Sequence, residues 1–220
     1  MKISVIVPVK NEAQSLQQVL NDIPHFVDEV IVVDGHSKDS TFLLAESHSR
    51  VTRVLSQYSQ GKGAALSAGF AVASGDLIAI IDADGSMNPN EMSSFISYFP
   101  EFDIVKGSRY LDGAGSSDLT RIRSFGNQIL TKIANVLFNQ KWTDMAYGYV
   151  VFTREAVQSL ALTNYDQLGS LLGHKSYGQG FEIETLMLCR AARRRMKILE
   201  IPSFENARIA GSSNLKAMRD

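Results

Sequence analysis

The sequence predicts an α/β fold with a mostly parallel central sheet and helices on both faces. Short apolar runs alternate with segments whose apolar residues recur every three or four positions, the pattern expected when strands alternate with helices. The chain has 220 residues, of which 45% are hydrophobic, so it can bury one sizeable core. We therefore expect residues 1–220 to form a single domain.

The first half of the chain shows this alternation regularly. Its apolar, β-branched runs have strand length, and the segments between them carry apolar residues at helical spacing. In chain order, the expected elements are a strand at 3–9, a helix at 11–20, a strand at 30–33, a helix at 40–48, a strand at 51–55, a helix at 63–73 and a strand at 77–81. Successive βαβ units make parallel strands, whose carboxyl ends meet at one edge of the sheet.

The second half is less regular. The elements expected there are a helix at 90–99, strands at 103–107, 147–152 and 197–201, and helices at 122–137 and 182–194. Residues 111–120 are rich in Gly, Ser and Asp, as expected of an exposed loop able to close over a ligand. The helix at 122–137 is amphipathic. We expect its apolar side to pack on the sheet, with contact to a membrane as the alternative.

The composition narrows the partners and the location. A net charge of −1 lacks the basic surface that nucleic-acid binding requires. The lone Cys189 cannot form an internal disulfide, which fits a reducing cytoplasm, and its apolar neighbours predict a packed helix residue. The amino terminus has no signal-peptide pattern, and no apolar run approaches the roughly 20 residues that span a bilayer. We expect a cytoplasmic protein, with peripheral contact to a membrane surface left open.

Two carboxylates, Asp82 and Asp84, follow the expected strand at 77–81. They therefore lie at the carboxyl end of a strand, where open α/β sheets bind ligands. Closely spaced carboxylates repel each other unless a cation lies between them, and hard oxygen ligands suit Mg²⁺ or Mn²⁺ that also binds substrate phosphates. The alternative is an ordinary turn that Asp82 begins and Asp84 and Gly85 complete.

Other polar residues converge on the same edge. The segment 8–12, at the end of the first strand, lacks G-x-G-x-x-G, so a Rossmann dehydrogenase is disfavoured. Asp34 ends the second strand and can accept hydrogen bonds from a base or a ribose hydroxyl, with a turn cap as the alternative. Lys62 lies between two glycines at a helix start and can meet a phosphate. The spacing of a P-loop ATPase is absent, and an ordinary helix start is the alternative.

Taken together and in order, these segments resemble the inverting family 2 glycosyltransferases with the GT-A fold, the fold of nucleotide-diphospho-sugar transferases. The first matching segments are 8–12, 32–41, 61–69, 75–84 and 107–110. Later matches are most similar to the branch that transfers sugars to dolichyl or polyprenyl phosphate. They are Arg109, Arg123, Asp144 with Gly148, residues 181–184, residues 200–202 and an R-x-x-G-x-S-x-L pattern at 208–215.

The resemblance implies a donor site and a metal site. The donor-binding residues it implies are Pro8, Glu12, Asp34, Lys62, Asp82, Ala83 and Asp84, with Glu12 and Asp34 holding the nucleoside. Asp82 and Asp84 would bind Mg²⁺ or Mn²⁺ on the donor diphosphate, with Ser86 where relatives often have a metal-binding Gln. Residues 34–37 read D-G-H-S in place of the commoner D-D-G-S. One carboxylate is therefore missing, and the base of a GDP- or UDP-sugar stays open.

The resemblance also implies an anion-binding acceptor site. Arg109, Arg123 and Arg208 match arginines that face the acceptor phosphate or the donor diphosphate, a task suited to a planar and permanently charged group. Surface salt bridges are the alternative for each of them. Asn127 stands where this branch often has a serine, and it can still donate a hydrogen bond to a phosphate.

The implied reaction is displacement at the anomeric carbon with inversion, and its implied catalytic residues are Asp84, Arg109, Arg123 and Asp144. A lipid phosphate is already anionic and needs no base, whereas a hydroxyl acceptor needs a carboxylate to take its proton. Asp144 is the candidate for that base or for orienting the acceptor, and a buried turn cap is the alternative. Polyprenyl phosphate is the favoured acceptor. Transfer to a saccharide or another hydroxyl, and a non-catalytic nucleotide-sugar binding module, are the alternatives.

Overall fold

The structure is a computed structural model that describes residues 1–162 and 180–211. The strands of its main sheet are β1 (Ile3–Val9), β2 (Glu29–Asp34), β3 (Arg53–Ser56), β4 (Leu77–Ile80), β5 (Ile104–Ser108), β7 (Val150–Thr153) and β8 (Ile198–Pro202). A second sheet pairs β6 (Gly115–Ser116) with β9 (Phe204–Glu205). The end of the terminal sequence pattern, residues 212–215, lies outside the described residues.

The helices are α1 (Leu16–Asp22), α2 (Thr41–Ser47), α3 (Lys62–Val72), α4 (Met92–Ile96) with the 3₁₀ helix η1 (Pro89–Glu91) before it, α5 (Arg121–Phe138), α6 (Arg154–Leu160) and α8 (Ile183–Arg193). Two of them differ from the prediction. The start of α1 is later than expected because Asn11 has a φ of 55°, outside the helical region. The sequence prediction missed α6, although Thr153 caps it by accepting a hydrogen bond from the backbone of Ala156.

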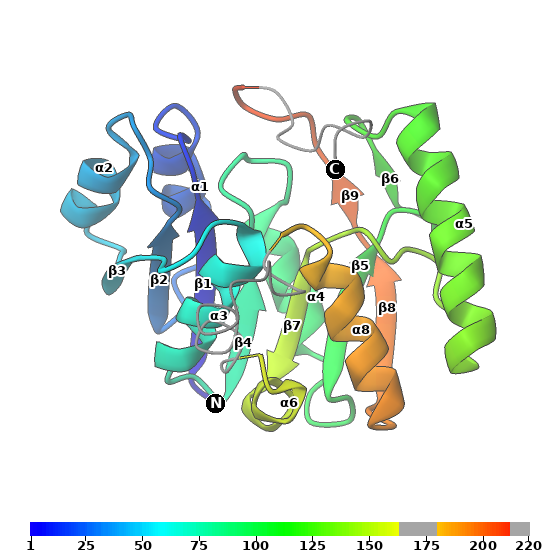
Figure 1. Cartoon of the computed structure of the whole chain (residues 1–220). Helices are drawn as coiled ribbons and strands as arrows, with labels where there is room; N and C mark the ends of the chain where they lie inside the picture. Colours follow the sequence, from blue (N-terminus) through cyan, green and yellow to red (C-terminus); the bar gives the residue numbers. More distant parts are fainter. Residues whose placement is uncertain (163–179, 212–220) are drawn as a thin grey trace.

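The predicted mostly parallel sheet is confirmed, with one strand running the other way. The strand order is β3-β2-β1-β4-β7-β5-β8, and only β7 is antiparallel to its neighbours β4 and β5. The parallel strands therefore end at one edge, the upper edge in Figure 1, where β7 begins. Loops that follow β1, β2, β4 and β5, and the segment that leads into β7, consequently meet at this edge.

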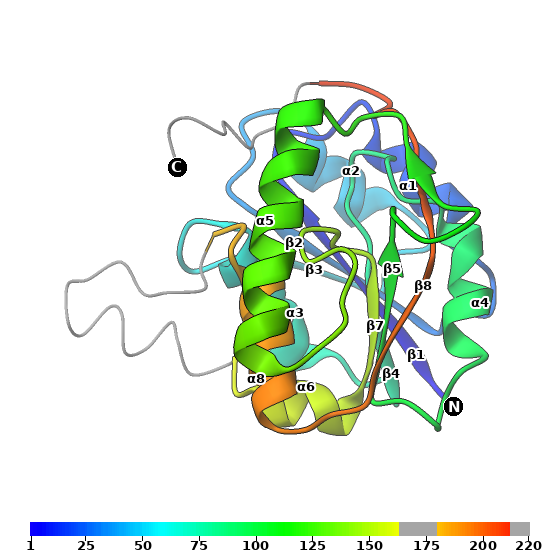
Figure 2. The same ribbon diagram turned by 90° about the vertical axis from the view of Figure 1, so that its right-hand side faces the viewer.

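The sheet lies between two layers of helices (Figure 2). On one face, Val5 and Val7 of β1 pack with Leu20 of α1 and Phe95 of α4 in one buried cluster. The other face packs against α3, α6 and α8 through a second buried cluster. Because alternate residues of a strand point to opposite faces, a central strand buried on both sides is apolar throughout, as β1 and β2 nearly are.

The helix α5 forms as predicted, but its predicted packing on the sheet is wrong. Its buried residues are Asn127, Thr131 and Ala134, whereas the apolar side is exposed. The reason is that the covered side of α5 lies over polypeptide backbone and a buried carboxylate, which need hydrogen-bond partners. Apolar contact on this side is limited to a small cluster in which Ala134 packs with Trp142 and Leu188. Among the described residues, no helix has the length and apolar character needed to cross a membrane.

Candidate active site

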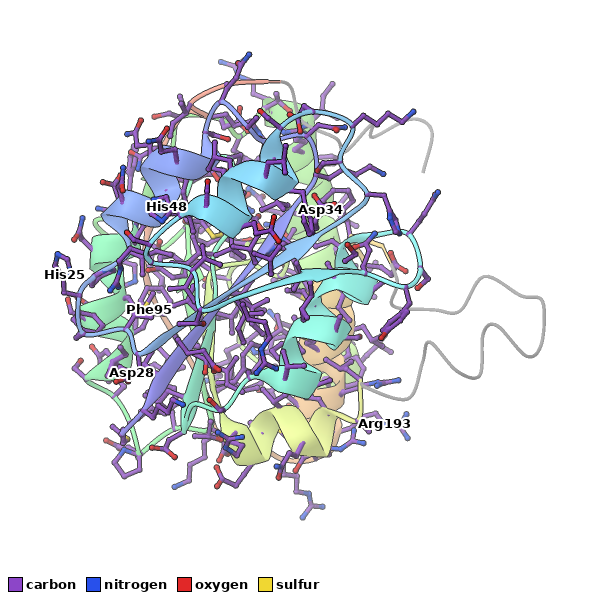
Figure 3. The ribbon with its side chains drawn as sticks, turned by 90° about the vertical axis from the view of Figure 1, so that its left-hand side faces the viewer. His25, Asp28, Asp34, His48, Phe95 and Arg193 are labelled. Carbon is purple, nitrogen blue, oxygen red and sulfur yellow. The ribbon has the colours of Figure 1, made fainter. Side chains whose placement is uncertain are left out.

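The carboxylates predicted from the sequence gather at the carboxyl edge of the sheet. Asp34 is the last residue of β2, and Asp82 and Asp84 follow β4, the strand on the other side of β1. Figure 3 shows Asp34 at this edge, with Asp28 and Arg193 toward the opposite end of the molecule. The fold thus brings acids from separate βα units to one place, as the parallel topology requires.

Asp34 has one carboxylate oxygen without a partner. The residue is 3% exposed, and its Oδ2 accepts a hydrogen bond from the backbone of Ser37 at 3.0 Å. Oδ1 is also buried, and it has no hydrogen-bond partner among the described residues. A buried acceptor of this kind is costly unless it is bonded, so this oxygen is available to an N–H or O–H group of a ligand.

Asp82 and Asp84 are each paired with a cation of the protein. The ammonium of Lys62 lies 2.7 Å from Asp82 and 2.6 Å from Glu184 of α8. The guanidinium of Arg208 lies 2.7 Å from Asp84 Oδ2, and the backbone N–H of Ser86 donates to Asp84 Oδ1 at 2.9 Å. Burial lowers the pKa of Lys62, but the charges of Asp82 and Glu184 outweigh burial and raise that pKa, so the amine stays charged.

Glu12 belongs to the same acidic cluster. Burial raises the pKa of Glu12, a hydrogen bond from Ser15 lowers it in part, and the negative charges of Asp84 and Asp82 raise it further. The loops after β1 and β2 are joined by a hydrogen bond from the backbone of Glu12 to Thr41 at 2.9 Å. The positive charge of Arg208 lowers the pKa of Glu12 in part, but burial and the neighbouring carboxylates keep it raised overall.

The acidic pair fits a divalent cation that obtains most of its ligands from elsewhere. Among residues 1–162 and 180–211, no group of three or more His, Cys, Asp or Glu side chains could hold a metal ion. Asp82 and Asp84 nevertheless both attract cations here, and carboxylate oxygens are hard ligands. The donor set suits an ion such as Mg²⁺ or Mn²⁺ that completes its shell with phosphate oxygens and water.

Three further predicted residues, Pro8, Ala83 and Ser86, are buried or half-buried near the ends of β1 and β4. Pro8 is a half-buried residue near the end of β1. Ala83, between the two acids, is 3% exposed and belongs to the buried core. Ser86 is buried as well, and its carbonyl accepts a hydrogen bond from the backbone of Asn206 at 2.8 Å.

Two glycines allow close packing around the acids. A Cβ at Gly148 would lie 2.3 Å from Glu184 Oε1 and 3.1 Å from Lys62 Nζ, so only glycine lets this pair reach Asp82. Gly85 has a φ of +80°, and a Cβ there would lie 2.3 Å from the side chain of Ile209. The segment that carries Arg208 therefore lies directly against the acidic loop.

Arg109 and Asp144 form a buried, bidentate ion pair. Arg109 Nε lies 2.7 Å from Asp144 Oδ2, and Nη2 lies 3.0 Å from Oδ1. The other arm of the guanidinium, Nη1, lies 3.1 Å from Glu205, and the group lies 4.9 Å from the centre of the Tyr147 ring. Burial raises the pKa of Asp144, but hydrogen bonds from Arg109 and the charge of Lys106 outweigh it, so that pKa is lowered. Asp144 thus stays ionised and orients Arg109.

Asn127 is buried, and it also contacts Asp144. Its amide nitrogen donates to Asp144 Oδ1 at 2.8 Å, and its oxygen accepts from the backbone of Ala146 at 3.1 Å. The sequence reasoning missed Lys106 and the contacts of Glu200, which hold the same segment. Lys106 donates a hydrogen bond to the carbonyl of Asp144, and Glu200 accepts one from the backbone N–H of Asp144 at 3.1 Å. A lysine inside a strand gave no signal that it would bind this backbone.

Asp118 links two of the predicted arginines and was also missed. Its Oδ2 lies 3.2 Å from Arg208 Nε and 3.8 Å from Arg123 Nη1. The stretch 111–120, predicted to be an exposed loop, contains β6, and the hydroxyl of Ser116 donates to Glu205 of β9. Arg123 and Arg208 are consequently joined to Asp84 through one chain of contacts.

A cavity of about 340 Å³ lies beside this network at the start of α5. Its lining residues are Arg109, Ser116, Leu119, Arg121, Ser124, Phe125 and Gln128. Arg121 beside Leu119 and Phe125 suits a ligand that carries an anionic group next to an apolar one, whereas the guanidinium of Arg109 is already paired with Asp144 and Glu205. Arg121 was not among the predicted arginines, and the predicted Arg123 is not among the residues that line this cavity.

A site of carboxylates, a lysine and arginines at the carboxyl edge of a parallel sheet is typical of α/β enzymes that bind phosphorylated ligands. Residues 4–161 match the family model described as glycosyl transferase family 2. The chain therefore belongs to family 2 of the glycosyltransferases and is a glycosyltransferase. The predicted family is confirmed.

The curated relatives include enzymes of lipid-linked sugar transfer. Glycosyltransferase AglJ of Haloferax volcanii is 29% identical over 99% of this chain and 68% of its own length. Dolichyl-phosphate beta-glucosyltransferase ALG5C of Trichomonas vaginalis is 29% identical over 96% of this chain and 65% of its own. Undecaprenyl-phosphate mannosyltransferase of Micrococcus luteus is 27% identical over 98% and 88%. The chain thus spans about two thirds of the length of the first two relatives.

The fold is shared with a solved glycosyltransferase. Glucosyl-3-phosphoglycerate synthase of Mycobacterium tuberculosis, solved with Mn²⁺, uridine diphosphate and glucosyl-3-phosphoglycerate, has a TM-score of 0.71 and 21% identity. The match covers 98% of this chain and 74% of that one. It establishes the GT-A fold that the sequence predicted.

Proposed function

We propose that this chain is a metal-dependent, inverting glycosyltransferase that moves a sugar from a nucleotide sugar to a polyprenyl phosphate. The observation that carries the proposal is the position of Arg208, which contacts Asp84 on one side and Asp118 on the other. A cationic group thus lies between Asp84 and Asp118, and Asp118 also lies 3.8 Å from Arg123 Nη1. This arrangement supports a diphosphate leaving group at the acids and an anionic acceptor beside it.

The donor half of the proposal concerns Asp34 and Glu12. The unpartnered oxygen of Asp34 would accept a hydrogen bond from the base or the ribose of the donor. Glu12, between this residue and the acidic pair, would complete the nucleoside pocket, with Pro8 and Ala83 in its walls. Both GDP- and UDP-sugars fit these groups.

Asp82 and Asp84 would hold Mg²⁺ or Mn²⁺, with the hydroxyl of Ser86 next to them. Such an ion supplies positive charge to the departing diphosphate. In support, the similar glucosyl-3-phosphoglycerate synthase has been solved with Mn²⁺ and with Mg²⁺, each together with uridine diphosphate. Arg208 would then exchange Asp84 for the diphosphate, and Lys62, which stays charged between Asp82 and Glu184, would remain as a second cation.

The acceptor half rests on Arg109, which Asp144 and Glu205 hold in one orientation. We propose that Arg109 and Arg123, with Arg121, attract the acceptor phosphate, and that Asn127 acts indirectly by fixing Asp144. Both oxygens of Asp144 are engaged by Arg109, and the pKa of Asp144 is lowered, mainly because Arg109 donates hydrogen bonds to it. Asp144 is therefore a poor base, which favours an acceptor that is already anionic over a saccharide hydroxyl.

An acceptor of this kind resides in a membrane. We accordingly propose that the chain works in the cytoplasm as a peripheral protein at the cytoplasmic membrane face. The relatives named for dolichyl phosphate and undecaprenyl phosphate support a lipid-phosphate acceptor.

The test is transfer of labelled sugar. GDP- and UDP-sugars with a radioactive hexose are incubated with polyprenyl phosphate and Mn²⁺, and the products are extracted into organic solvent. We expect label in the organic phase, and none with the Asp82→Asn, Asp84→Asn double variant or after chelation of the metal. Label that appears only in water-soluble saccharides would contradict the lipid acceptor, and full activity of the double variant would contradict the metal site.

A further inference from the structure

We propose that the exposed side of α5 is the surface by which this chain docks on a lipid membrane. This surface, the α5 outer face, comprises Ile122, Phe125, Ile129, Leu130, Ile133, Val136 and Leu137. The inference extends the proposed function, since a lipid-linked acceptor needs the enzyme at a membrane. It is carried, however, by the exposure and charge of one helix.

The α5 outer face is apolar and open along the whole helix. Ile122 is 79% exposed at one end and Val136 is 83% exposed at the other. The residues that face the protein, Asn127, Thr131 and Ala134, occupy the opposite side of the helix. Figure 2 shows α5 as an outer layer running from the carboxyl edge of the sheet toward its other end. A contiguous apolar surface of this size marks an interaction site.

The charges around this face favour a membrane. The helix has no Asp or Glu, and its cations are Arg121, Arg123 and Lys132. Lys141 follows the helix and is exposed, and so are Arg193 to Arg195 at the end of α8, which packs on α5. An apolar helix face bordered by cations is the pattern of helices that lie in the interface of a bilayer with anionic headgroups.

A second copy of the chain fits this surface poorly. In a symmetric dimer, the same face would meet itself. Both ends of α5 are flanked by cations, Arg121 at its start and Lys141 after its end, so parallel and antiparallel pairing would each bring like charges together. Headgroups of opposite sign remove this conflict.

The face also adjoins the cavity beside Arg109. Phe125 belongs to both, and Leu119 and Arg121 line the cavity next to it. A lipid phosphate that enters the cavity from the bilayer can therefore keep its hydrocarbon chain within the membrane. This step depends on the proposed acceptor, whereas docking of the face does not.

The experiment is flotation of the full chain with vesicles in the absence of any donor or acceptor. We expect it to float with vesicles of phosphatidylcholine and phosphatidylglycerol and less with phosphatidylcholine alone. The triple variant Ile122→Ser, Val136→Ser, Leu137→Ser, which leaves the cavity lining unchanged, should bind about tenfold or more weakly. Leu43→Ser is the matched control, because Leu43 is 67% exposed on α2, away from this face.

Unchanged flotation of the triple variant, with an unchanged melting temperature, would overturn the proposal. So would a wild-type dimer in sedimentation that the triple variant converts to a monomer, because the face would then join two copies. A short-chain polyprenyl phosphate dissolved in detergent distinguishes this failure from failure of the proposed function. Transfer to it needs no membrane, so the triple variant should retain that activity.

Discussion

The helices α5 and α8 pack against each other, yet they bury opposite kinds of residue. α8 buries Ile183, Met187, Leu188 and Ala191, and its arginines are at its exposed end. α5 buries Asn127 and Thr131 and exposes its apolar side. Both sequences have the periodicity of an amphipathic helix. Periodicity thus identifies a helix and its two sides, but not which side the protein covers.

The neighbours of the two helices explain the difference. α8 covers the apolar face of the sheet in the same buried cluster as Phe152. α5 covers the segment before β7, where Asp144 and the backbone of Ala146 need hydrogen-bond partners. The two helices also serve different halves of the site, since Glu184 of α8 holds Lys62 and Asn127 of α5 holds Asp144.

The largest effect should come from removing the carboxylate over which α5 lies. Among the described residues, Asp144→Asn would leave the buried Arg109 with only Glu205 as its ionic partner. We expect this variant to lower the free energy of unfolding by about 3 kcal/mol or more. Urea denaturation measures this. Asp112→Asn, at an exposed carboxylate, is the control, and equal stability of the two variants would show that the buried pair is dispensable.

The packing of the two helices can be compared by shortening one apolar residue on each. Met187→Ala on α8, at a residue 2% exposed, should cost about 2–5 kcal/mol because it leaves a cavity. Val136→Ala on α5, at a residue 83% exposed, should change stability by no more than about 0.5 kcal/mol. Chemical denaturation of both variants provides the measurement. A cost at Val136 similar to that at Met187 would mean that α5 is covered in solution.

Affinity for Mn²⁺ should distinguish Arg208, which lies beside the acidic pair, from Arg121 on α5. Arg208 neutralises Asp84, so a divalent cation that binds there, as proposed, would have to compete with it. We expect Arg208→Ala to bind Mn²⁺ about threefold more tightly in the absence of nucleotide, while sugar transfer decreases. Electron paramagnetic resonance of free Mn²⁺ measures the affinity. Arg121→Ala, which removes a charge of the α5 side, should leave Mn²⁺ affinity unchanged, and a weaker affinity of the Arg208 variant would contradict the competition.

The smallest effect concerns pH. The pKa of Glu12 is raised in the folded chain, chiefly by burial, so the folded state binds this proton more tightly than the unfolded state. Stability is therefore lost as the pH rises from the ordinary pKa of glutamate through the folded value. We expect Glu12→Gln to have a higher melting temperature than the wild type at pH 7. At pH 4, about the ordinary pKa of glutamate, the two melting temperatures should be equal. Thermal melts across this pH range test the prediction, with Glu46→Gln, at an exposed glutamate, as the control. A melting temperature of Glu12→Gln below that of the wild type at pH 7 would contradict it.

Much of the site could be predicted because strand ends are local features. Asp34, Asp82 and Asp84 each follow an apolar run, and parallel topology brings such ends together. The partners of the arginines could not be predicted in this way. Asp118 and Glu205 lie in loops and short strands with no apolar pattern, and their contacts with Arg208 and Arg109 span large sequence separations.

The sequence by itself determined the alternation of strands and helices, the edge where the acids meet and the membership in family 2, because each depends on local periodicity or on ordered motifs. The tertiary structure alone decided that Asp144 orients Arg109, that Arg208 lies on Asp84 and that α5 turns its apolar side outward. These outcomes depend on which groups become neighbours after folding. A side chain's role is set by the hydrogen bonds and charges it then meets.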